Sequence, residues 1–171
     1  MPEPRLSCPD MQALELLIRP ADASEAAQLI ALVIRSKAHW GYSAEFLQQA
    51  APELTVSEQD IAEGKVSVAE LNERPVGISV LDLAEPAELV ALFVEPDVIG
   101  RGVGRALLAH ELNRARAAGV DSVLIESDPN AEPFYRAHGA EPIANRTSST
   151  TGRQLTLLRL RVPKALEPPF S

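Results

Sequence analysis

The fold is decided by the stretch Leu89-Val-Ala-Leu-Phe-Val-Glu-Pro-Asp-Val-Ile-Gly-Arg-Gly-Val-Gly-Arg-Ala-Leu-Leu108, in which an apolar strand runs into a glycine-rich turn that opens a helix. Glycines in the turn let the backbone take a positive φ and approach a ligand without a Cβ in the way. The start of the helix carries N–H groups without intrahelical partners, and its dipole favours an anion. Pro96 ends the strand, because it cannot donate to a β-ladder. The stretch therefore predicts a cradle for a phosphate or pyrophosphate group.

Two common phosphate-binding signatures fail against this turn. The dinucleotide fingerprint G-x-G-x-x-G would need a glycine at Arg105 or Leu107. A Walker A loop needs a Gly-Lys pair, and no lysine lies between Lys65 and Lys164. Glu126 sits roughly where a dinucleotide fold would place its ribose-binding acid, so a dinucleotide-dependent enzyme stays open as an alternative.

Composition frames the chain as one domain. The 171 residues are 46% hydrophobic and 23% charged, enough for one substantial core. No apolar run approaches the roughly 20 residues of a membrane span, and no secretion signal is recognised, so we expect a cytoplasmic protein without a membrane partner. The single cysteine, Cys8, rules out an internal disulfide. The net charge of −8 argues against a nucleic-acid surface; it suits an amine substrate, or simply solubility.

The periodicity of apolar residues and the turn residues predict alternating helices and strands between a leader at 1–12 and a Pro-rich tail at 163–171, so the single domain spans 13–162. Helices are expected at Glu25–Lys37, Ser43–Ala50, Gly104–Ala118 and Ala131–His138. Strands are expected at Leu14–Arg19, Val66–Leu71, Pro75–Leu83, Glu88–Val94, Ser122–Glu126, Pro142–Ala144 and Gln154–Val162. The second and third strands form a hairpin, the later part contains a βαβ unit, and the Val-Leu-Ile run of the fifth strand predicts burial on both faces.

Two motifs in this order resemble the GCN5-related N-acetyltransferases, or GNAT family. The first is Leu92-Phe-Val-Glu-Pro with the glycine-rich turn, and the second is Asp128-Pro-Asn-Ala-Glu-Pro-Phe-Tyr-Arg-Ala-His-Gly-Ala140. The resemblance runs from about Leu16 to Arg161. It departs at Ile99, where the family often has Gln or Arg; because backbone N–H groups do most of the holding, the cradle is kept.

The resemblance implies an α/β fold of the GNAT type, a mixed sheet of about seven strands flanked by about four helices and splayed at the site of acetyl-CoA, the co-substrate. The sequence has no metal-ligand spacing, so no metal is expected, and a homodimer is compatible with the resemblance. Backbone groups of Leu92, Phe93 and Val94 would pair with the pantetheine arm. Asn130 would hydrogen-bond that arm, or cap the following helix. The pyrophosphate would be held by Gly100, Arg101, Gly102, Val103, Gly104 and Arg105.

Tyr135 is the expected catalytic acid. The resemblance directs its hydroxyl at the sulfur, and the chemistry agrees: a leaving thiol has a pKa near 8.5, whereas a tyrosine with a pKa of about 10 stays protonated at pH 7. The alternative is an aromatic that only packs in the core beside Phe134, although of the two only Phe134 is expected to be pure core.

Glu88 is the expected general base for the amine. An amine with a pKa of about 10.4 is mostly protonated at pH 7, and removing its proton costs roughly 4.6 kcal/mol of free energy. Strand alternation places Glu88 on one face with Val90, Leu92 and Val94, at the start of the strand that leads to the glycine-rich turn. An ordinary solvated carboxylate is the alternative, and Glu126 is a poorer candidate.

The acceptor pocket is expected to use Trp40 and Tyr42, between the first two helices, where the family usually places a pocket wall. Packing alone is the alternative for Trp40. His39 is a candidate proton relay or a surface residue, and His110 and His138 are expected to be structural, without metal-ligand spacing.

We therefore predict an N-acetyltransferase that moves the acetyl group of acetyl-CoA to a primary amine by direct attack in a ternary complex. The acceptor, a small molecule or a peptide, is left open. A non-catalytic acyl-CoA-binding sensor and a dinucleotide-binding enzyme are the alternatives.

Overall fold

The computed structural model describes residues 15–54, 56–149 and 151–164, which form one seven-stranded mixed sheet and five α-helices. The predicted leader at 1–12 and most of the predicted tail lie outside the described residues. The strands are β1 (Leu16–Pro20), β2 (Val66–Leu71), β3 (Arg74–Asp82), β4 (Glu88–Val94), β5 (Ser122–Ser127), β6 (Glu141–Thr147) and β7 (Gln154–Arg161), in the order β1-β2-β3-β4-β5-β7-β6. The helices are α1 (Ala26–Ala38), α2 (Ala44–Leu54), α3 (Glu58–Ala62), α4 (Val103–Ala117) and α5 (Glu132–Ala137).

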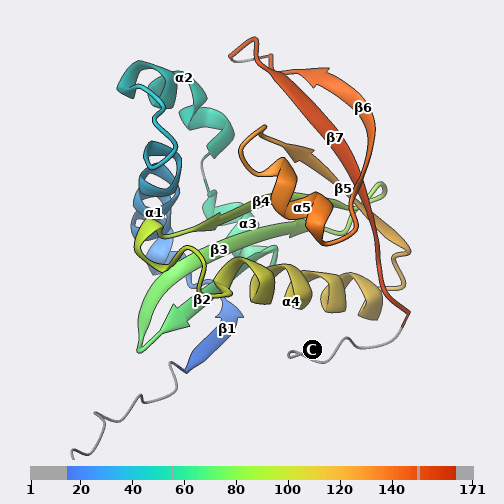
Figure 1. Cartoon of the computed structure of the whole chain (residues 1–171). Coiled ribbons are helices and arrows are strands. Elements are labelled where there is room, and N and C mark those ends of the chain that lie inside the picture. Colours follow the sequence, from blue (N-terminus) through green and yellow to red (C-terminus); the bar gives the residue numbers. More distant parts are fainter. Residues whose placement is uncertain (1–14, 55, 150, 165–171) are drawn as a thin grey trace, which may run out of the picture.

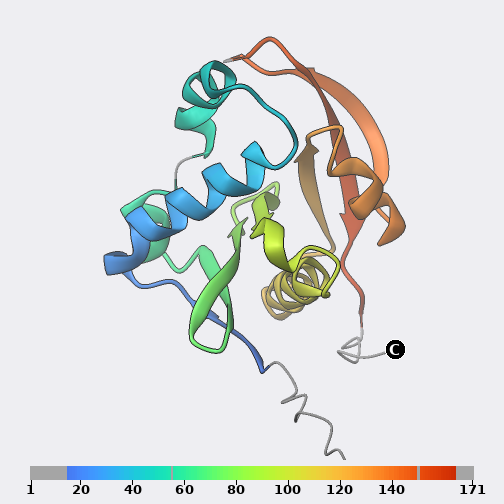
Figure 2. The same ribbon diagram turned by 60° about the vertical axis from the view of Figure 1, so that its left-hand side comes forward.

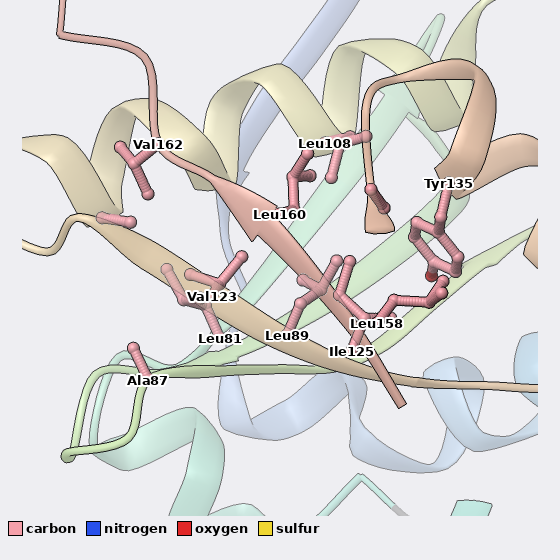
Figure 3. Packing of buried hydrophobic residues seen from close by; sticks show 12 residues of the cluster. Leu81, Ala87, Leu89, Leu108, Val123, Ile125, Tyr135, Leu158, Leu160 and Val162 are labelled. Carbon is pink, nitrogen blue, oxygen red and sulfur yellow. The ribbon is translucent and has the colours of Figure 1, made fainter. Parts of the chain in front are cut away.

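Helices cover both faces of the sheet (Figure 1). Helices α1 and α3 pack on β2 and β3 around Leu29, Ile61 and Ile78. On the opposite face, α4 and α5 pack on β3, β4, β5 and β7, and Figure 3 shows this cluster with Leu108, Ile125 and Tyr135. We call the side of the sheet that carries α1 the α1 face and the side that carries α4 the α4 face.

The parallel pair β4–β5 is the irregular joint of the sheet. It is registered at one position, Glu88 with Leu124, whereas every other pair of neighbouring strands runs for five or six positions. Beyond Glu88 the two strands diverge, so the second half of β4 has β3 on one side and no strand on the other. Backbone N–H and C=O groups on that open side need other partners.

A β-bulge at Val90 overturns the alternation predicted for β4. Leu89 pairs with Leu81, but Ala91 pairs with Val80, so Val90 is the extra residue. Leu89 therefore packs on the α4 face and Ala91 on the α1 face. Glu88, next to Leu89, lies on the α1 face, opposite to Leu92 rather than beside it.

The predicted elements are all present, with ends displaced by a few residues. The short helix α3 was not predicted, which makes five helices instead of about four. Ser43 caps α2 as expected, since its hydroxyl accepts from the backbone N–H of Phe46 at 3.1 Å. The prediction that β5 is buried on both faces is wrong: Leu124 is only half-buried and Glu126 is exposed, because the helices on the α1 face do not cover this part of the sheet.

The β6–β7 hairpin arches away from the sheet and returns to the helices of the α1 face. Both views place its tip beside α2 (Figures 1 and 2). All residues of β6 are exposed. The hairpin and α2 thus stand on either side of the divergence of β4 and β5.

Gly77 of β3 lets α4 approach the sheet closely. A Cβ at this position would lie 2.9 Å from Cδ1 of Leu107 and 3.0 Å from Cγ1 of Val103, both buried residues of α4. The first turn of α4 is therefore seated directly on β3, which fixes the height of the turn that precedes it.

We predict that Gly77→Ala lowers the free energy of unfolding by about 1–3 kcal/mol, because the methyl group overpacks a filled core. Equilibrium urea unfolding measures this change. A stability equal to that of the wild type would contradict the tight contact between β3 and α4.

Candidate active site

A cavity of about 420 Å³ opens where β4 and β5 part. It lies between the end of α1, the second half of β4, the start of α4, and the segment from the end of β5 into α5. Its lining consists of Ser36, Lys37, Trp40, Leu92, Phe93, Val94, Val98, Ile99, Gly100, Gly102, Val103, Gly104, Arg105, Asp128, Asn130, Ala131, Phe134 and Tyr135. Most residues predicted for the site are therefore brought together, while Arg101, Tyr42 and Glu88 do not line the cavity.

The glycine-rich turn has the geometry predicted for an anion cradle. Gly100 and Gly102 have φ values of +83° and +84°, and nothing lies within 4 Å of a Cβ built on either. Gly102 is the N-cap of α4, so the N–H groups of the first helical turn face the cavity mouth without side-chain cover. This part of the chain fits a phosphate-bearing group, with the positive end of a 15-residue helix behind it.

The second half of β4 offers a free ladder edge to the cavity. Leu92 and Phe93 pair with Ser79 and Ile78 of β3 on one side, and their other side faces the gap left by β5. An extended ligand with amide groups can hydrogen-bond there as an added strand would.

Tyr135 projects from α5 into the α4-face core and reaches the cavity. It is only 5% exposed, and burial raises the pKa of its hydroxyl well above the usual value. Its ring lies at one end of the apolar cluster in Figure 3 and meets Phe134 edge to face at 5.2 Å. The expectation that only Phe134 is pure core is wrong: Phe134 is the more exposed of the two, and it packs against the cradle at Gly104.

Asp128, which the sequence reasoning did not single out, is the polar centre of the site. One carboxylate oxygen accepts from Lys37 Nζ at 3.0 Å, Tyr42 Oη at 2.6 Å and Arg153 Nη1 at 3.0 Å; the other accepts from the backbone N–H of Asn130 at 2.9 Å. Burial alone would raise the pKa of Asp128, but these hydrogen bonds and the charge of Lys37 outweigh it and hold the pKa well below the usual range. The carboxylate therefore stays ionised and ties α1, the α1–α2 loop, the β6–β7 loop and the β5–α5 loop together.

Tyr42 and Arg153 extend this centre to the hairpin tip. The Arg153 guanidinium lies 4.7 Å from the ring centroid of Tyr42 and 5.1 Å from that of Phe46, and the two rings stack at 4.5 Å. Tyr42 is thus a wall residue that stands behind the cavity lining. The alternative prediction that Asn130 caps the following helix is wrong, because the N-cap of α5 is Ala131. The Nδ2 of Asn130 instead donates to Tyr42 Oη at 2.8 Å.

Glu88 lies on the α1 face at the point where β4 and β5 part. Burial and the neighbouring charge of Glu126 raise its pKa above the usual value, Arg146 lowers it, and Asp82 raises it slightly. Glu126 and Arg146 form an ion pair of 3.2 Å on the same face. Glu88 and Tyr135 therefore lie on opposite faces of the sheet, Glu88 on the α1 face and Tyr135 on the α4 face.

Of the remaining candidate residues, Trp40 lines the cavity and the three histidines do not. Trp40 lines the cavity with half of its side chain exposed, whereas His39 is exposed outside the lining and stacks edge-on with Trp40 at 5.2 Å. His110 is half-buried in α4, and His138 bonds the carbonyl of Phe134 at 2.8 Å, as expected of structural residues.

Within the described part of the chain, no group of three or more His, Cys, Asp or Glu residues could hold a metal ion. No helix among the same residues is long and apolar enough to cross a membrane.

A mixed sheet that parts beside a helix N-terminus is the architecture that the sequence motifs predicted, and comparison with known proteins agrees. A family model described as an acetyltransferase (GNAT) domain matches residues 21–156. The peptidyl-lysine N-acetyltransferase YjaB of Escherichia coli is 31% identical over 147 residues, which cover 84% of this chain and 94% of that protein. The chain therefore belongs to the GNAT family of acetyltransferases, and the predicted family and enzyme class are confirmed.

Solved structures agree on the fold. A GCN5-related N-acetyltransferase from Rhodopseudomonas palustris superposes with a TM-score of 0.72 at 25% identity, over 85% of this chain and 94% of that one. The PaiA N-acetyltransferase from Thermoplasma acidophilum, solved with coenzyme A, superposes with a TM-score of 0.73 at 16% identity. The match covers 86% of this chain and 99% of that one. The predicted fold class is thus confirmed.

We predict that Arg153→Ala frees the β6–β7 tip from the α1–α2 loop, because it removes an ion pair to Asp128 and two cation–π contacts. Removing these contacts should lower the free energy that holds the tip in place by about 1 kcal/mol. Amide hydrogen exchange at Thr147 and Gln154 should become faster. Arg161→Ala, which changes an exposed arginine at the far end of β7, is the control, and equal exchange in the two variants would contradict the anchoring role.

Proposed function

We propose that this acetyltransferase moves the acetyl group of acetyl-CoA to the ε-amine of a lysine side chain, by direct attack in a ternary complex. The observation that carries the proposal is the cavity at the parting of β4 and β5, with an anion cradle at its mouth and Tyr135 inside it. Acetyl-CoA is the donor: it supplies an activated thioester, an extended arm with amide groups, and a pyrophosphate.

The residues fit these three parts of the donor in order. The start of α4, from Gly100 to Arg105, suits the pyrophosphate. The free edge of β4 and the side chain of Asn130 suit the amide-bearing arm. Buried Tyr135 also lines the cavity, and the thioester would lie beside it.

Tyr135 acts as the acid. When the amine forms its bond to the acetyl carbon, the carbon–sulfur bond breaks and the electron pair leaves on sulfur. A phenol in this position donates a hydrogen bond or its proton to the departing thiolate. Burial raises the pKa of Tyr135, so the hydroxyl carries its proton at pH 7, and among the described residues it has no hydrogen-bond partner.

Glu88 acts as the base from the opposite side of the sheet. The acceptor amine approaches from the α1 face, where Glu88 and Leu124 are half-buried and Glu126 is exposed. Because Glu88 lies outside the cavity lining, it takes the proton through a water molecule. Its raised pKa makes it a stronger base than a solvated carboxylate.

The acceptor is a cation before it reacts, which is compatible with the acidic face at Glu88 and Glu126. Two relatives that are named peptidyl-lysine N-acetyltransferases support lysine as the acceptor. Cytoplasmic location and a homodimer stay predictions.

Incubation with [¹³C]acetyl-CoA and a lysine peptide with a blocked N-terminus tests the proposal by mass spectrometry. We expect a labelled acetyl group on lysine and an equal amount of free coenzyme A. Two other acceptors are tested in parallel. One is a lysine-free peptide with a free N-terminus, and the other is spermidine. Acetylation of either one alone would contradict the lysine assignment, and binding of acetyl-CoA without transfer to any amine would instead favour an acyl-CoA sensor.

Replacement of Tyr135 by Phe should lower kcat by about 100-fold, because it removes the acid and keeps the ring in its packing. The KM for acetyl-CoA should change little. Steady-state kinetics measure both, and a kcat within twofold of the wild type would show that Tyr135 is not the acid.

The pH profile of kcat/KM tests Glu88. A base must be deprotonated, so activity should rise with pH through the raised pKa of Glu88. Glu126→Gln removes a negative neighbour and should move this rising limb to lower pH, whereas Arg146→Gln removes a positive neighbour and should move it to higher pH. If the profiles of both variants coincide with that of the wild type, Glu88 is excluded as the titrating group.

A further inference from the structure

We propose that Asp128 is a positioning residue that fixes which end of the Asn130 side-chain amide faces the cavity, so that Asn130 presents its carbonyl oxygen to an N–H group of the donor's arm. The inference rests on the proposed function, in which Asn130 contacts that arm. The contacts that carry it form a chain of three groups: the Asp128 carboxylate, the Tyr42 hydroxyl and the Asn130 amide.

The direction of the chain follows from what each group can donate. An ionised carboxylate only accepts hydrogen bonds, so the Tyr42 hydroxyl must donate its single hydrogen to Asp128, at 2.6 Å. The Tyr42 oxygen can then only accept from Asn130. This requires the NH₂ end of the amide at 2.8 Å from the hydroxyl and turns the carbonyl end away from it.

Each link of the chain is held in its state. Lys37 and Arg153 keep a positive charge 3.0 Å from the same oxygen of Asp128, which keeps the carboxylate ionised. Burial and the bond to Asp128 raise the pKa of Tyr42, partly offset by Arg153, so the phenol keeps its proton. A second bond, from the Asn130 backbone N–H to the other Asp128 oxygen at 2.9 Å, sets the main chain that carries the amide.

The consequence is a cavity wall of fixed polarity. An amide that is free to rotate presents either a donor or an acceptor, whereas the anchored Asn130 presents an acceptor only. It therefore selects a ligand N–H at this point of the cavity. A ligand carbonyl there would leave two acceptors facing each other.

Calorimetric titration with coenzyme A tests this through a double-mutant cycle that needs no turnover. Asn130→Ala and Asp128→Ala should each weaken binding by about tenfold. The double variant should bind as weakly as Asn130→Ala alone, because Asp128 acts through Asn130. Asp60→Ala, which removes an ion-paired carboxylate on α3 that does not line the cavity, should leave the affinity unchanged.

Tyr42→Phe repeats the cycle while keeping Asp128 paired with Lys37 and Arg153, and it serves if Asp128→Ala fails to fold. It too should weaken binding in the wild-type background and add nothing to Asn130→Ala. Unchanged affinity in Asp128→Ala and Tyr42→Phe, or losses that multiply with that of Asn130→Ala, would overturn the positioning role alone. Unchanged affinity in Asn130→Ala would overturn the proposed donor contact as well.

Discussion

The whole site depends on one constraint, the loss of pairing between β4 and β5 after a single registered position. A parallel neighbour would have satisfied the backbone of β4 on that side and closed the sheet. Because the strands part, the free edge of β4, the start of α4 and the end of α1 border one cavity. The bulge at Val90 lies beside this joint and sends Glu88 and Leu92 to opposite faces. The joint thus separates the two halves of the proposed chemistry as well as opening the site.

Charged groups of opposite sign lie on the two sides of the β4–β5 joint. Asp128 keeps Lys37 and Arg153 near the cavity, in a cluster with one net positive charge. On the α1 face, half-buried Glu88 lies near exposed Glu126, and burial and the charge of Glu126 raise the pKa of Glu88. An anionic donor and a cationic acceptor are therefore each offered a surface of opposite charge, and each can reach the gap from its own side.

How far the sequence predicts the site depends on how local each feature is. The cradle and the pair Asn130 and Tyr135 are written in two short contiguous motifs, and both motifs lie at the cavity. The Asp128 centre was missed because its partners are 91 and 25 residues away, at Lys37 and Arg153. Charged side chains at such distances look like ordinary surface residues. The bulge at Val90 has no residue signature, so an argument from alternation failed for Glu88.

Backbone NMR of the uniformly ¹⁵N-labelled protein during titration with coenzyme A tests the central claim most directly. We expect amide shifts to cluster at Leu92–Val94, at 100–105 and around Asn130 and Tyr135, on both sides of the β4–β5 gap. A second hollow of about 480 Å³, lined by Arg159, Arg161 and Lys164, is the internal comparison. Shifts confined to that basic hollow would contradict the account.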